Sequence, residues 1–128
     1  MPGTVDYSLA RRAVLRDLQR GIVCRRDVCD AHPDLIRAAN YSGEHTPDAC
    51  PVCAGGELRL VSYVFSDEFS KRENGKVWRP GNLTPLLEFR EVRLYTVEVC
   101  VECSWNHLRS QVAVGHGGAR RRGREAST

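Results

Sequence analysis

Apolar residues recur at helical spacing in two stretches near the start of the chain. In the stretch 6–20 they fall every three or four positions, at Tyr7, Ala10, Val14 and Leu18. Asp6 is a suitable N-cap and Gly21 a suitable stop for this helix. A further turn is expected at 25–29, and a helix that starts at Pro33 and ends at Gly43. Residues 1–43 are therefore predicted to form a short helical module.

The hydrophobic period changes from helical to two after residue 53. Alternating patterns rich in β-branched and aromatic residues predict strands at 56–65, 89–99 and 107–114. The segment 66–88 is too long for a simple hairpin loop, and it contains Asn-Gly and Pro-Gly turn signals. We interpret it as an inserted loop. Residues 117–128 are rich in Gly and Arg and are expected to be a disordered basic tail.

Four of the cysteines form two CxxC pairs, Cys50–Cys53 and Cys100–Cys103. Each pair can occupy a tight turn that directs two sulfurs to one point, and two such turns supply the ligands of a tetrahedral structural Zn²⁺. The first pair precedes a predicted strand and the second joins two others, which is typical of a zinc ribbon. The 46-residue spacer exceeds the usual ~15–20 residues, and the insertion at 66–88 accounts for the excess. The predicted fold class is thus α+β, with the helical module followed by an antiparallel three-stranded zinc ribbon at 44–116.

Other uses of the CxxC pairs are less consistent with the sequence. A redox pair should open a helix inside a βαβ pattern, and neither pair does so. Haem attachment requires CxxCH, whereas Ser104 follows Cys103. Disulfides conflict with a cytoplasmic location, which we expect because the N-terminus has no apolar signal segment and no stretch could span a membrane. Iron in the same cysteine cage stays open.

Several further residues could serve the chemistry of a site. Cys24 and Cys29 are expected to be small buried hydrophobes, although a second metal site is conceivable. His45 and His107 lie close enough to the CxxC pairs to replace a ligand, but four thiols already suffice. Asp30 and His32 are expected to cap the helix at Pro33 rather than to form an acid–base pair.

The charge of the chain is unevenly distributed. Residues 44–116 carry eight Lys or Arg and ten acids, a balance of −2, whereas 117–128 carry four Arg and one Glu, a balance of +3. The predicted ribbon would therefore repel phosphate, and only the tail is clearly basic. This distribution weakens the case for nucleic-acid binding by the ribbon itself.

The motifs DVCDAHP, CPVC, LVSYVF, RLYTVEVC and CSWNHL occur in this order. Together they resemble a family of small actinobacterial proteins classed as a domain of unknown function, over roughly residues 5–115. The resemblance implies a cytoplasmic, zinc-bearing protein. It transfers no catalytic residue, because the family has no assigned activity.

Three functions compete at this stage. The first is a non-enzymatic adaptor that docks a protein partner of the transcription or translation machinery, such as RNA polymerase or the ribosome. The second is a nucleic-acid-binding regulator that uses the N-terminal helices and the tail. The third is an enzyme, thiol-redox or of another type; no small-molecule substrate can be identified. The candidate partner-binding residues are Trp78, Arg79, Arg11, Arg12, Arg120, Arg121 and Arg122.

Overall fold

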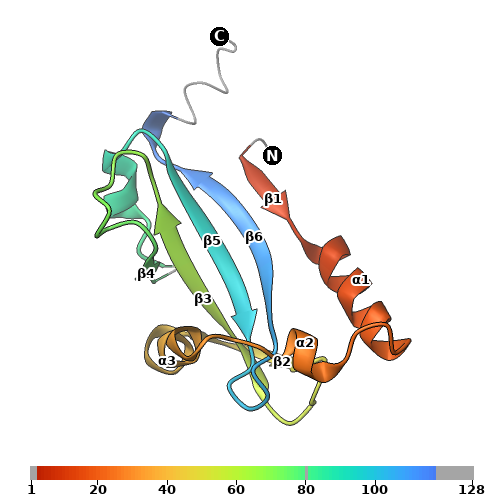
Figure 1. Cartoon of the computed structure of the whole chain (residues 1–128). Helices are drawn as coiled ribbons and strands as arrows, with labels where there is room; N and C mark the ends of the chain where they lie inside the picture. The colour runs from red at the N-terminus through yellow and green to blue at the C-terminus, as the bar shows by residue number, and fades with distance from the viewer. Residues whose placement is uncertain (1–2, 80, 118–128) are drawn as a thin grey trace.

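A computed structural model describes residues 3–79 and 81–117, and a six-stranded antiparallel sheet forms the centre of this part of the chain (Figure 1). Its elements follow in the order β1 (Thr4–Asp6), α1 (Ser8–Gln19), α2 (Arg25–Val28), α3 (Pro33–Ser42), β2 (Glu44–Ala49), β3 (Glu57–Phe65), β4 (Lys76–Trp78), the 3-10 helix η1 (Thr84–Glu88), β5 (Val92–Val99) and β6 (Asn106–Val114). The α+β class with an antiparallel sheet is therefore as predicted.

The sheet has six strands rather than the three of the predicted ribbon. Its strand order is β1-β6-β5-β3-β2, and β4 pairs with β3 beyond the end of β2. The three predicted strands are the neighbours β3, β5 and β6 at its centre. β1 and β4 span three residues each, too few to show a period of two, and β2 is a mostly exposed polar segment that contains a proline. The prediction missed these strands because pairing to the central strands, rather than local pattern, forms them.

The helices begin close to the predicted positions. α1 starts at Ser8, and Asp6 lies in β1 rather than at the N-cap. The Asp6 carboxylate nevertheless accepts a hydrogen bond from the Ser8 N–H at 2.7 Å. Pro33 opens α3, and Nδ1 of the N-cap residue His32 accepts a bond from the Asp34 N–H at 3.0 Å. His32 thus takes the capping position that the sequence indicates.

The two faces of the sheet are covered differently. On one face Ala39 of α3 packs against Val61 and Val99. The opposite face carries two apolar clusters. Near the cysteines, α1 contributes Val14 and Leu15 to a cluster with buried Cys50, Leu58, Cys100 and Trp105. A separate cluster combines Val64, Leu86, Val92 and Leu94. Since β1 pairs with β6 and α1 packs beside the cysteines, the N-terminal segment shares the sheet and the core of the rest.

The inserted segment 66–88 folds back onto the sheet. β4 pairs with β3, and Trp78 packs against the cluster around Leu86. The indole Nε1 of Trp78 donates a hydrogen bond to the Asn82 carbonyl oxygen at 2.6 Å. Trp78 is therefore partly buried, and among the described residues of this segment the exposed large apolar side chains are Val77, Leu83 and Leu87.

None of the helices within residues 3–79 and 81–117 combines the length and apolar character that crossing a membrane requires.

Candidate metal centre

The two CxxC pairs occupy matching turns at one end of the sheet. Residues 50–53 connect β2 to β3, and residues 100–103 connect β5 to β6. Because β3 and β5 are antiparallel neighbours, with Arg59 opposite Val99, the start of one strand lies beside the end of the other (Figure 1). The pairing of the central strands thus brings two cysteine pairs that are distant in sequence to the same place.

The backbone follows the same path in both turns. The Ala54 N–H donates to the Cys50 carbonyl at 3.0 Å, and the Ser104 N–H donates to the Cys100 carbonyl at 2.9 Å. Ala54 and Ser104, each directly after the second cysteine, adopt left-handed φ values of 57° and 72°. This conformation costs a non-glycine residue roughly 1–2 kcal/mol, so both turns keep a strained residue at the same position. Such repeated strain is expected where a bound ion fixes the turn.

The four thiols have the spacing that a tetrahedral metal ion requires. The Sγ atoms of Cys50, Cys53, Cys100 and Cys103 all lie within 4.8 Å of one another. The Cys50–Cys103 and Cys53–Cys100 sulfur pairs are each 3.7 Å apart. Metal–sulfur bonds of about 2.3 Å at tetrahedral angles put neighbouring sulfurs about 3.8 Å apart. The donor set and its geometry therefore fit one thiophilic ion.

Thiol acidity differs across the cluster. A hydrogen bond from the Gly55 backbone N–H lowers the pKa of Cys53 to about 7, because it stabilises the thiolate. Burial raises the pKa of Cys100 and of Cys103, because it disfavours a charged sulfur. Four thiolates this close repel one another, so full ionisation of the cluster requires a cation among them.

Apolar side chains surround the four cysteines, which therefore form part of the core. Trp105 is fully buried and packs with Cys50, Cys100 and Leu58. Trp105 directly follows the second turn, so its ring covers the cysteines. The indole Nε1 of Trp105 donates a hydrogen bond to Oε2 of the buried Glu98 at 2.7 Å.

The other cysteines and histidines lie outside the four-thiol group. Cys29 is half-buried, and its Sγ lies 3.7 Å from that of Cys103. Cys24 is exposed at the start of α2, so its expected burial is wrong. His45 is exposed on β2. The His107 ring stacks on Trp105 with centroids 5.9 Å apart, as expected of a residue that packs beside the turn.

The structure separates the predicted partner-binding residues. Arg11 binds the buried carboxylate of Glu98, whereas Arg12 and Arg79 are exposed. Trp78 packs against the sheet, as described above. Arg120, Arg121 and Arg122 lie outside the described residues.

Sequence reasoning missed Glu98 as a central residue. Glu98 is 0% exposed and faces the same side of the sheet as Leu94 and Thr96. The sequence did contain a signal for Glu98. The alternation of β5 puts this charged residue on the same face as Leu94 and Thr96, which point towards the interior. A carboxylate on that face requires charged partners from other elements.

The fold and the four cysteines together define an α+β protein with a four-cysteine cluster that could hold a metal ion. The chain belongs to the family of unknown function DUF5318, which it matches over residues 2–128. This finding confirms the resemblance inferred from the motifs. The chain is also similar to uncharacterized protein Mb0050 of Mycobacterium bovis and uncharacterized protein Rv0049 of Mycobacterium tuberculosis. Each is 35% identical to it over 111 residues, which cover 87% of this chain and 81% of the relative. No solved structure matches the chain.

Proposed function

We propose that this protein is a non-enzymatic structural-zinc protein that docks a protein partner. The observation that carries the proposal is the tetrahedral spacing of four cysteine sulfurs inside an apolar cluster. Four cysteines fill every position of a tetrahedral ion, so no position is left for a reactive water or a substrate. The same cage suits iron, and zinc is favoured because Cys₄ is a standard structural zinc set.

Elemental analysis of the purified full-length chain tests the metal. We expect one zinc per chain, lost in the Cys53→Ser and Cys103→Ser variants. Cys24→Ser is the matched control, because Cys24 is exposed and outside the group, and it should retain the metal. Absence of any metal from the wild-type protein, or equal loss in the control, would overturn the proposal. One iron in place of zinc would overturn the choice of ion.

The inserted segment 66–88 is the proposed docking surface. Its apolar side chains Val77, Leu83 and Leu87 are 37%, 37% and 51% exposed. Val77 lies in β4, which within the described part of the chain pairs with β3 alone. An edge strand flanked by apolar side chains can add a strand from a partner protein. The exposed Arg79, directly after β4, is available for polar contacts at its rim.

Affinity purification from native lysate at moderate salt tests docking. We expect a stoichiometric partner from the transcription or translation machinery that is lost from the Leu83→Ser/Leu87→Ser variant. Leu9→Ser/Ile22→Ser is the control, because these side chains are 73% and 65% exposed at the N-terminal helices. Recovery of no stoichiometric protein would contradict the proposal, as would a partner that both variants retain.

A further inference from the structure

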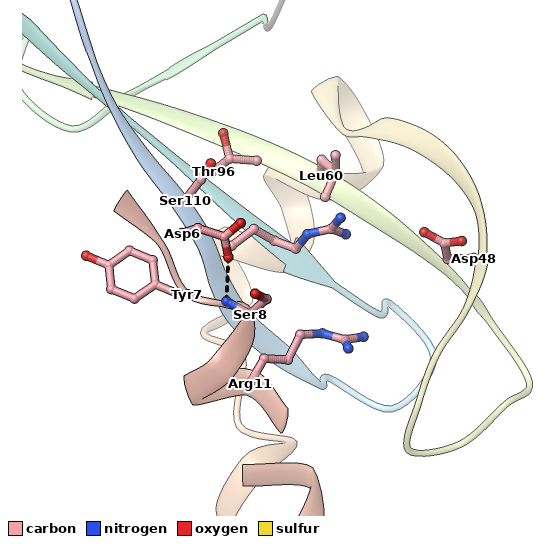
Figure 2. Close-up of a pocket in the computed structure, with 9 residues that line it drawn as sticks. Asp6, Tyr7, Ser8, Arg11, Asp48, Leu60, Thr96 and Ser110 are labelled. Atoms are coloured by element: carbon pink, nitrogen blue, oxygen red, sulfur yellow. Dashed lines mark hydrogen bonds between the residues drawn. The ribbon is translucent and has the colours of Figure 1, made fainter. Parts of the chain in front are cut away.

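A cavity of about 500 Å³ opens on the sheet face beside the N-terminus of α1 (Figure 2). Its volume falls within the range of small-molecule sites, roughly 300–1,000 Å³. None of the four clustered cysteines lines it. The cavity draws its walls from β1, α1, β2 and the three central strands. The lining residues that the argument uses are Asp6, Arg11, Asp48, Leu60, Arg109 and Ser110.

Beside this cavity Glu98 holds two arginines in place. Glu98 is fully buried, and Nε of Arg11 donates to both of its carboxylate oxygens, at 2.8 and 2.9 Å. Nη1 of Arg109 lies 3.5 Å from Oε1. Together with the bond from Trp105, these contacts satisfy a carboxylate that would be strongly destabilising if buried alone. Glu98 therefore fixes the positions of both guanidinium groups.

The two arginines offer more N–H donors than the Glu98 carboxylate uses. One buried carboxylate faces two guanidinium groups, and Arg11 uses only its Nε in these contacts. Neither Nη group of Arg11 contacts Glu98, and Figure 2 shows the Arg11 side chain extending away from α1. The side chains of Arg11 and Arg109 remain 27% and 40% exposed. A guanidinium group is planar, and its paired N–H donors match the spacing of two oxygens of a carboxylate or a phosphate.

Two acidic residues, Asp6 and Asp48, also line the cavity, so with Glu98 three carboxylates stand near the two arginines. Asp6 is engaged with the Ser8 N–H, and hydrogen bonds to Ser8, with a smaller contribution from the charge of Arg109, lower its pKa. Asp48 lies on β2, away from α1 (Figure 2). Arginines accompanied by carboxylates suit a molecule that carries an anionic group together with an amine or hydroxyl, rather than a simple anion alone.

We propose that this cavity binds a small polar metabolite through a carboxylate or phosphate group held between Arg11 and Arg109. The site is independent of the docking surface at 66–88 and goes beyond the proposed function. The Ser110 hydroxyl and Asp48 then contact the remainder of the ligand.

NMR titration of the ¹⁵N-labelled, metal-loaded full chain tests the site. The probes are inorganic phosphate and malonate, each compared with sodium chloride at equal ionic strength. We expect saturable shifts of the Arg11 Nε resonance and of the Ser8 and Ser110 amides with at least one probe. The probe that binds distinguishes a phosphate from a carboxylate ligand.

Variants locate the binding. Arg109→Gln is the main test, because Arg109 is more exposed than Arg11 and contacts Glu98 at the longer distance. It should weaken binding at least about tenfold, the loss of one charge-assisted interaction. Arg16→Gln, an exposed arginine of the same helix that does not line the cavity, should change affinity less than about twofold.

A second variant tests the cavity without changing the ion pairs of Glu98 with the two arginines. Leu60→Trp extends a larger ring into the cavity and leaves both arginines in place, so it should also weaken saturable binding. Shifts that never saturate with either probe would overturn the proposal. Equal affinity of Arg109→Gln and Arg16→Gln, or undiminished binding by Leu60→Trp, would place the anion elsewhere and would overturn it equally.

Discussion

Gly56, directly after the first cysteine turn, lies close against the second turn. A Cβ atom at this position would lie 2.7 Å from Cγ of Glu102 and 3.0 Å from Sγ of Cys100. The Glu102 side chain can move aside, but a sulfur that binds a metal cannot do so without loss of its bond. A single missing methyl group therefore allows the first turn to lie against the ligands of the second.

We predict that Gly56→Ala weakens metal binding by about 10–100-fold, the usual effect of disturbing the support of a ligand. Competition with a chromophoric chelator measures the affinity. Gly55→Ala is the matched control, because its Cβ would meet only the Cys53 carbonyl oxygen, at 3.8 Å. Equal affinities of the two variants would show that the turns have room to separate.

The residues of the candidate site that could be predicted are those identified by their spacing in the sequence. The four cysteines follow from the CxxC spacing and lie together. By contrast, Ala54 and Ser104 are not residue types that signal a left-handed backbone, since glycine and asparagine usually fill such positions. The contact between Cys29 and Cys103 depends on how α2 packs, which no local pattern specifies.

At the scale of elements, α1 is attached to the sheet by both charge and apolar contact. Arg11 reaches the buried Glu98 of β5, and Val14 and Leu15 pack against the cluster around the cysteines. These three side chains share the inward face of the helix. The ion pair also determines where along the sheet the helix can lie, because a fully buried carboxylate tolerates few alternative positions for its partner.

We predict that Arg11→Met lowers the free energy of unfolding by about 2–3 kcal/mol, because Glu98 loses its nearest counter-charge inside the protein. Chemical denaturation of metal-loaded protein measures the change. The double variant Arg11→Met/Glu98→Gln should recover part of this loss, since the amide removes the buried charge and keeps an acceptor for the Trp105 N–H.

Arg16→Met controls for the loss of an arginine from α1 and should change stability by less than about 0.5 kcal/mol. If Arg11→Met behaves like Arg16→Met, the contact with Glu98 contributes nothing to stability.

Elements with a long, regular pattern were predictable. α1, α3, β3, β5 and β6 all begin or end within a few residues of their predicted limits. The pairing of β1 with β6 and of β4 with β3 was not predictable, because three-residue strands contain too little pattern to identify them. Register and strand order depend on contacts between distant segments, and the sequence of one strand does not encode them.

At the scale of the whole molecule, the described part of the chain holds several small apolar clusters rather than one large core. The apolar side chains fall into three groups on two faces of one sheet, and the cysteines form the centre of the group that also holds α1. Structural zinc contributes about 10–16 kcal/mol near neutral pH, comparable with or larger than the usual total stability of about 5–15 kcal/mol. The metal is therefore expected to decide whether the fold persists.

We predict that a strong chelator unfolds the protein in a single cooperative transition at room temperature. Near-ultraviolet circular dichroism, which reports the environment of buried Trp105, follows the loss. Addition of zinc should restore the signal under reducing conditions. An unchanged spectrum and melting temperature, after elemental analysis has verified metal removal, would show that the apolar clusters suffice without the ion.

Trp105 joins the metal centre to the cavity. Its ring packs on Cys50 and Cys100, and its Nε1–H donates to the same Glu98 that orients Arg11 and Arg109. The cavity was beyond prediction from sequence because six elements assemble it. One physical link between the two sites is a hydrogen bond of 2.7 Å, which can be removed while the aromatic ring is kept.

We predict that Trp105→Phe retains one metal ion per chain but binds the anionic probe about three- to tenfold more weakly. Without the indole donor, Glu98 has a free acceptor position and draws Arg109 closer, so that fewer guanidinium donors face the cavity. Elemental analysis and the NMR titration measure the two properties on the same sample. Loss of the metal together with the anion would instead assign Trp105 a purely packing role. Full retention of anion affinity would show that the arginines hold their positions without the Trp105 bond.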